Sequence, residues 1–117
     1  MRLLIESTKG FKDYEVFMRA MGVVMGQMED KDGSIDVFSV GSHKLNAMAS
    51  EFFNVTENSL KARGIKHSFN ILPKSVPEMM ITRFNYMAYL SNPENTKLSK
   101  LTKLAEENGI EVGIFRY

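Results

Sequence analysis

The chain has 117 residues, of which 44% are hydrophobic and 25% charged, and a net charge of +1 at pH 7. These values predict one globular domain over residues 1–117 that buries a core without disulfide bonds. The lack of cysteine excludes a thiolate zinc site, and two histidines cannot form a metal site alone. The small net charge argues against nucleic acid as a partner. No apolar run is long enough for a membrane span, and early charges argue against a signal peptide, so we expect a cytoplasmic protein.

The N-terminal part predicts a strand followed by a helix. Residues 3–5 form a short apolar run that is typical of a buried strand. Over residues 14–28, apolar side chains recur at spacings of three and four, which predicts a helix with Asp13 as its N-cap. Methionines form a stripe on this helix: Met18, Met21, Met25 and Met28. Because methionine adapts to irregular surfaces, the stripe can be a partner-binding face, but we favour packing in the core or between subunits.

The same strand-then-helix pattern follows. Residues 35–38 predict a second strand, and the apolar positions of residues 45–52 predict the inner face of a helix. This helix either continues to Arg63, with Gly64 just past its end, or is interrupted so that Thr56 caps a new helix. The residues alone leave both alternatives open.

The second half contains three further apolar runs that predict strands, at residues 65–72, 86–90 and 110–115. Between the first two runs, Ser75 and Glu78 have the spacing of a capping box and predict a short helix. The apolar positions of that helix are Met79, Met80 and Phe84. Between the last two runs, Thr96 is the predicted cap of a helix that ends at Asn108-Gly109.

Strands thus alternate with helices along the whole chain, and no hairpin signal joins two strands. This alternation predicts an α/β fold: a Rossmann-like three-layer sandwich with a five-stranded, mainly parallel sheet and about four helices. Open parallel sheets bind ligands at the carboxyl ends of their strands, so the loops that follow the strands are the first place to seek a site.

Short motifs lie at several of these junctions: Ser7-Thr8-Lys9 followed by Phe11, Asp13 and Tyr14; Val40 through Asn46; Arg63-Gly64-Ile65; and Thr96. In this order they resemble the SLOG family, the superfamily of the LOG enzymes and the DNA-processing A protein. The similarity is greatest to its short single-domain members, which are common in bacteria and phages. A phage-encoded member would act in the host cytoplasm. The Arg-Asn pair that the family carries before its fourth strand is missing here.

The resemblance implies a nucleotide or nucleotide-derived ligand at the loops after the first, second and fourth strands. Its candidate contacts are Thr8, Lys9, Gly41, Ser42, His43, Lys44, Asn46 and Thr96. The family has three glycines and an acidic residue after the second strand, where amides approach phosphate oxygens closely. Here only Gly41 remains of the glycines, and Asn46 replaces the acid. We therefore expect binding, for sensing or sequestration, without efficient catalysis.

Other interpretations of the same residues remain open. Ser42 can simply cap a strand-to-helix turn, and residues 7–9 can be an exposed loop. His43 can act as a general acid or base, but no carboxylate lies near it in sequence. A protein-interaction scaffold that uses the methionine stripe, acting as a homo-oligomer or on a host or defence protein, is the first alternative function. A LOG-type hydrolase or transferase is the second, and the missing glycines and acid count against it. We assign no catalytic residue and no metal.

Overall fold

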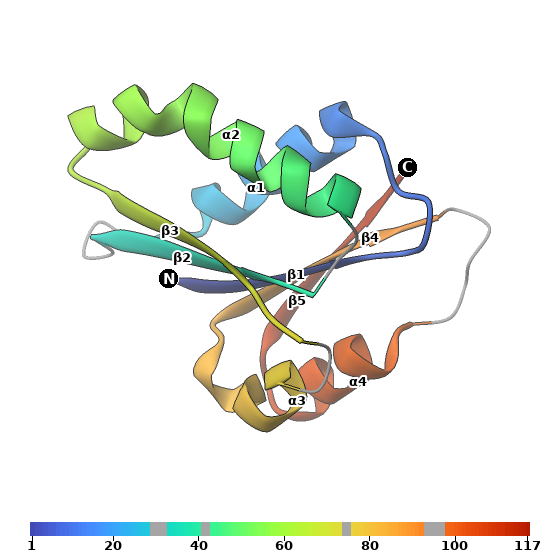
Figure 1. The fold of residues 1–117 in the computed structure, drawn as a ribbon. Helices are drawn as coiled ribbons and strands as arrows, with labels where there is room; N and C mark the ends of the chain where they lie inside the picture. Colours follow the sequence, from blue (N-terminus) through green and yellow to red (C-terminus); the bar gives the residue numbers. More distant parts are fainter. Residues whose placement is uncertain (29–32, 41–42, 74–75, 93–97) are drawn as a thin grey trace.

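The computed structural model describes residues 1–28, 33–40, 43–73, 76–92 and 98–117. Its strands form one sheet: β1 (Arg2–Ser7), β2 (Ser34–Ser39), β3 (Lys66–Ile71), β4 (Tyr86–Ser91) and β5 (Glu111–Arg116). The strand order is β3-β2-β1-β4-β5, and every neighbouring pair is parallel. Figure 1 shows α1 and α2 on one side of this sheet and α3 and α4 on the other. The predicted Rossmann-like three-layer fold is confirmed, with a sheet that is parallel throughout.

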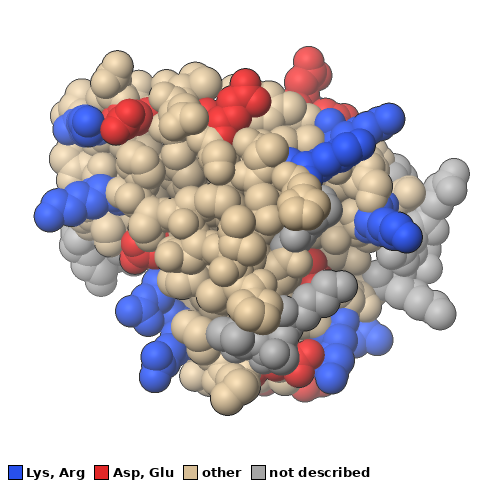
Figure 2. All heavy atoms as spheres, viewed as in Figure 1, with Lys and Arg blue, Asp and Glu red and all other residues tan. Residues whose placement is uncertain are grey.

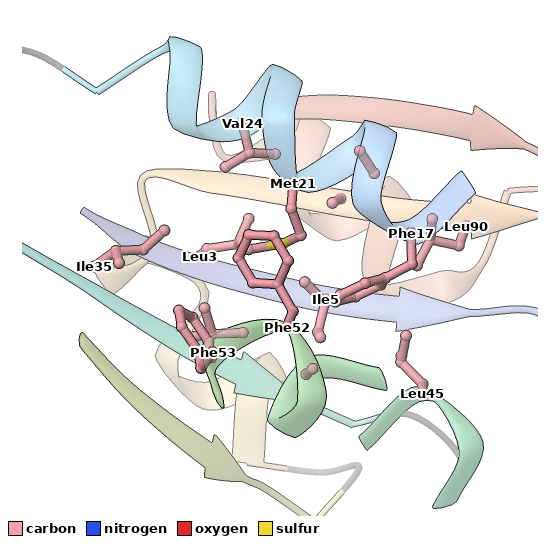
Figure 3. Close-up of a cluster of buried hydrophobic side chains, with 14 of the residues drawn as sticks. Leu3, Ile5, Phe17, Met21, Val24, Ile35, Leu45, Phe52, Phe53 and Leu90 are labelled. Carbon is pink, nitrogen blue, oxygen red and sulfur yellow. The ribbon is translucent and has the colours of Figure 1, made fainter. Parts of the chain in front are cut away.

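The larger core lies between the sheet and the helices α1 (Tyr14–Gly26) and α2 (His43–Ala62). Asp13 caps α1 as predicted, because its side chain accepts a hydrogen bond from the Val16 amide at 3.2 Å. Figure 3 shows side chains from β1, α1 and α2 meeting in this cluster. The labelled members are Leu3, Ile5, Phe17, Met21, Val24, Ile35, Leu45, Phe52, Phe53 and Leu90.

The methionine stripe of α1 mainly serves this core. Met21 is fully buried, and Met25 and Met28 are partly buried against the same cluster. Only Met18 is turned outward, with 46% of its surface exposed. The favoured interpretation of the stripe as packing is therefore confirmed for three of its four members, and little apolar surface is left for a partner.

The helix α2 is continuous from His43 to Ala62, so of the two alternatives that the sequence leaves open, the uninterrupted helix is the one that forms. The Thr56 hydroxyl instead donates to the Phe52 carbonyl one turn earlier, at 2.8 Å. Such a bond lets threonine remain inside a helix without acting as a cap. Gly64 follows the helix with a φ of 72°, as the sequence predicts for a residue just past a helix end.

A smaller core lies on the opposite face, under α3 (Val76–Met80), the 3₁₀ turn η1 (Ile81–Arg83) and α4 (Lys100–Glu107). The predicted inward position of Met79 is wrong, since 86% of this side chain is exposed. The helix changes to the tighter 3₁₀ turn after one turn, and Ile81 is buried instead. Phe84 is buried as predicted.

An ion pair links the two short helices on this face, and the N-cap of α4 is not the residue that the sequence predicts. Glu78 of α3 forms an ion pair with Lys100 of α4 at 3.5 Å. The predicted partner of Glu78 in the capping box, Ser75, lies outside the described residues. The N-cap of α4 is Ser99, whose hydroxyl accepts from the Thr102 amide at 3.0 Å. The predicted cap, Thr96, also lies outside the described residues, and the helix begins after it because Ser99 supplies the capping oxygen.

Candidate functional site

The order of the strands defines one special position at the edge of the sheet. From β1 the chain moves outward to β2 and β3, and then returns to the other side of β1 to form β4 and β5. The carboxyl ends of β1 and β4 therefore lie at the point where the direction of winding reverses. In open α/β sheets this point is where the loops diverge and ligands bind. In Figure 1 these strand ends lie on the right.

Three of the predicted contacts lie near this edge and are exposed: Lys9, His43 and Lys44. Lys9 follows β1, and the other two begin α2 directly after β2. Figure 2 shows Lys and Arg side chains at the right margin, the side toward which the strands run, and a second group at the left margin. Positive charge is thus available at the carboxyl edge, although it is not confined there. Gly41, Ser42 and Thr96 lie outside the described residues.

The structure gives Thr8 an internal role that the sequence does not predict. Its hydroxyl lies 2.7 Å from the Tyr117 hydroxyl and accepts a hydrogen bond from the Asn92 amide at 3.0 Å. Its backbone amide also donates to the Leu90 carbonyl at 2.9 Å. The ring of Tyr117 packs edge-on against Phe11, with the centroids 4.8 Å apart. Thr8 thus ties the ends of β1, β4 and β5 together, and its hydroxyl is already engaged.

Asn46 is similarly engaged. Its side-chain oxygen accepts a hydrogen bond of 2.6 Å from the hydroxyl of Ser39, the last residue of β2. Ser39 is fully buried. This bond attaches the first turn of α2 to the end of β2, which makes Asn46 a structural residue of the turn.

Apolar side chains fill both sides of the junction between β2 and α2. Val40 is buried in the smaller core, and Leu45 is buried in the larger one. The junction therefore leaves little room for a ligand beneath it. A ligand at this corner would be held mainly by exposed groups such as Lys44, which is a looser arrangement than the glycine-rich turn of the SLOG family.

Serine ends each of the three central strands, and this feature was missed in the sequence. Ser7, Ser39 and Ser91 are the last residues of β1, β2 and β4. Ser39 and Ser91 are buried, and the hydroxyl oxygen of Ser7 is buried with no hydrogen-bond partner among the described residues. In the sequence, this feature could have been found as a serine at or near the end of each of these apolar runs. The three serines place small hydroxyl groups at the carboxyl edge of the sheet.

A second polar feature lies on the face of the sheet that α4 covers. Glu6 of β1 and Tyr89 of β4 are opposite each other in the register of the two strands. One carboxylate oxygen of Glu6 is buried, and only 4% of Tyr89 is exposed. Burial, then the charge of Glu6, and then Tyr117 raise the pKa of Tyr89 above its usual value of 10.0. Tyr89 consequently remains a neutral hydroxyl throughout the physiological range.

The raised pKa values of two tyrosines predict a loss of stability at alkaline pH. Burial, followed by the charge of Glu111, raises the pKa of Tyr86 above 10.0 in the same way. Above pH 10 the unfolded chain therefore loses these protons while the folded chain retains them. The contribution of these tyrosines to the free energy of unfolding is therefore at its full value below pH 10. It decreases as the pH rises from 10 toward the pKa values of the folded state. Urea unfolding between pH 8 and 11 should show this decrease, and Tyr86→Phe or Tyr89→Phe should each make it smaller. If the free energy of unfolding fell with pH as steeply in both variants as in the wild type, these two tyrosines would not be its cause.

Comparison with protein-family models, curated proteins and solved structures finds no match for the chain. Within the described ranges, no helix is both long enough and apolar enough to cross a membrane. The fold and the geometry of its edge are therefore the grounds on which a function can be argued, and the resemblance to SLOG proteins stays a prediction.

Proposed function

We propose that the protein binds a nucleotide or nucleotide-derived ligand at the carboxyl edge of its sheet, in sensing or sequestration, without efficient catalysis. One observation carries the proposal: the winding of the sheet reverses between β1 and β4, and exposed cations follow β1 and β2 beside this point. Diverging loops at such a reversal leave space for a small molecule. The ammonium groups of Lys9 and Lys44 supply the charge that a phosphate group needs.

The internal bonds of the edge refine the predicted contact set. Thr8 and Asn46 are used to hold strand ends and the first turn of α2, so the direct contacts are assigned to Lys9, His43 and Lys44. The neutral side-chain amide of Asn46 is not basic enough to remove a proton from a substrate, unlike the acidic residue that the family has at this position. This is the reason that we favour binding over a hydrolase or transferase reaction.

The test is a thermal-shift series with AMP, ATP, NAD, ADP-ribose and a cyclic dinucleotide. A ligand at 100 times its dissociation constant adds ~2.7 kcal/mol to the free energy of unfolding, which raises the melting temperature by several degrees. Lys44→Glu should weaken binding of the active compound at least tenfold, because it replaces an attractive charge with a repulsive one. Lys66→Glu is the matched control, since it makes the same charge change at the amino end of β3. A melting temperature unaffected by every compound would overturn the proposal.

The alternative of a protein-interaction scaffold has weaker support. Its predicted surface was the methionine stripe, and α1 leaves only Met18 and Val23 as large exposed apolar residues. Two separate side chains form a small patch compared with the area that a stable interface buries. Light scattering would still reveal a homo-oligomer, and a dimer without any nucleotide response would favour this alternative.

A further inference from the structure

We infer that Tyr117 is a positioning residue of the proposed site, because it holds both ends of the turn that presents Lys9 to the phosphate of the ligand. This inference rests on the proposed function and deepens it, since it names the group that fixes one of the two lysines before a ligand arrives. Tyr117 does not touch the ligand itself. It acts through the backbone of the turn at residues 8–11.

Lys9 lies at the tip of a tight turn that directly follows β1. The amide of Phe11 donates to the carbonyl of Thr8 at 3.3 Å, which closes a turn of four residues. Gly10 has a φ of 87°, whereas no residue other than glycine has a positive φ in the described part of the chain. This combination matches a type II turn, whose third position favours glycine because its φ is positive. Lys9 occupies the second position of the turn and is exposed.

Tyr117 contacts both ends of this turn. Its hydroxyl lies 2.7 Å from the hydroxyl of Thr8, and its ring packs edge-on against Phe11 with the centroids 4.8 Å apart. Phe11 is fully buried, so this end of the turn is also fixed by the larger core. The amide of Tyr117 donates to the carbonyl of Ser91 at 3.2 Å, which fixes the tyrosine beside β4. Figure 1 shows the end of the chain near the segment that joins β1 to α1.

The hydrogen bonds of the Thr8 hydroxyl leave a defined place for Tyr117. The Thr8 oxygen accepts from the Asn92 amide at 3.0 Å and donates to the Leu90 carbonyl at 3.4 Å. A threonine hydroxyl can donate one hydrogen bond and accept two. The hydroxyl of Tyr117 therefore supplies the second bond that Thr8 accepts. Through this one hydroxyl, the turn is tied to the ends of both β4 and β5.

A fixed turn favours binding because ordering a loop on association reduces the affinity. The side chain of Lys9 remains free to adjust, but its backbone already has one position beside the point where the winding of the sheet reverses. Loosening the turn would spread the ammonium group over more positions and lower the fraction of time that it lies near a phosphate. The hydroxyl of Tyr117 should therefore affect binding only as long as the charge of Lys9 is present.

The hold on the turn can be tested without any ligand, by hydrogen exchange measured with NMR. Tyr117→Phe keeps the ring and removes only the hydroxyl. The amides of Phe11 and Asn92 should then exchange about fivefold faster, as expected from the loss of one hydrogen bond. The amide of Gly64, which donates to the Lys61 carbonyl just past the end of α2, should exchange at an unchanged rate.

The role toward the ligand can be tested by a double-mutant cycle of Tyr117→Phe with Lys9→Gln, measured by calorimetry. AMP, ATP, NAD, ADP-ribose and a cyclic dinucleotide are each titrated into the wild type, both single variants and the double variant. We expect Tyr117→Phe to weaken binding about fivefold when Lys9 is present and to have no effect in the Lys9→Gln background. A merely structural effect would weaken binding equally in both backgrounds.

Two further variants serve as controls. Thr8→Ser retains the hydroxyl that Tyr117 contacts, so it should exchange and bind as the wild type does. Tyr86→Phe also removes a hydroxyl from a tyrosine, but at the amino end of β4, and should leave binding unchanged. Melting curves without ligand establish that each variant is folded.

The outcomes distinguish this inference from the proposed function. If the wild type binds one of the compounds and Tyr117→Phe changes neither the exchange of the turn nor the affinity, the role of Tyr117 is overturned while the proposed function stands. Equal weakening with and without Lys9 would also overturn this role. A wild type that binds none of the five compounds would overturn both.

Discussion

Replacing Phe17 by alanine is expected to lower the free energy of unfolding by about 3–5 kcal/mol, which is the cost of removing a buried aromatic ring and leaving a cavity. Phe17 is 1% exposed and lies where α1 meets α2 and the sheet, as Figure 3 shows. Its ring packs edge-on against Phe52 at a centroid distance of 6.1 Å and stacks with Tyr14 at 6.2 Å. For a chain with a total stability of about 5–15 kcal/mol, this loss is a large fraction.

The neighbouring residue provides the control. Met18→Ala changes a side chain of similar length on the same helix, but this side chain points outward. Its effect should remain within about 0.5 kcal/mol, as for most surface substitutions. Urea unfolding of both variants gives the comparison. A loss of less than 1 kcal/mol for Phe17→Ala, or equal losses for the two variants, would mean that α1 does not pack as described.

Gly113→Ala is expected to destabilise the protein by about 1–3 kcal/mol, although alanine usually suits a strand better than glycine does. A Cβ atom at Gly113 would collide with the hydroxyl of Tyr86 and would lie 2.8 Å from Cε2 of Phe115. Tyr86 is buried in the larger core and cannot move away freely. The absence of a side chain on β5 therefore makes room for the hydroxyl that ends the Tyr86 ring.

The cause can be isolated by combining this change with Tyr86→Phe. Removing the hydroxyl relieves one of the two collisions, so the double variant should lose less stability than the sum of the single variants. The contact with Phe115 remains, so we expect the recovery to be partial. Because the residues touch, a double-mutant cycle from urea unfolding measures their coupling directly. If Gly113→Ala alone stabilised the protein, Gly113 would not lie as close to the Tyr86 hydroxyl and the Phe115 ring as described.

Features that depend on neighbouring residues were predictable from the sequence. The five strands, the cap at Asp13 and the left-handed glycine after α2 all follow from hydrogen bonds and periodicities within a few residues. The errors at this level concern the ends of elements. Met79 was assigned to an inner face because a longer regular helix was assumed, but α3 ends at Met80 and Ile81, the first residue of the 3₁₀ turn, is buried instead.

The candidate site was predictable in location but only partly in its members. A parallel sheet places functional groups at the carboxyl ends of its strands, so the loops containing Lys9 and Lys44 could be chosen from the fold class alone. Thr8 and Asn46 were also chosen, and their hydrogen bonds to Tyr117 and Ser39 were not predictable. The partner of Thr8 lies 109 residues away in the chain, and the order of the strands decides which distant groups meet.

The sequence by itself thus determined that this is an alternating α/β protein with exposed cations after its first two strands. Only the tertiary structure decided that β1 lies between β2 and β4, and that Glu6 therefore faces Tyr89. The physical reason is that turns and helices are stabilised by groups close in sequence. Which strands become neighbours depends instead on how the helices pack on the two faces of the sheet. That choice depends on the packing of the whole chain, and no local pattern records it.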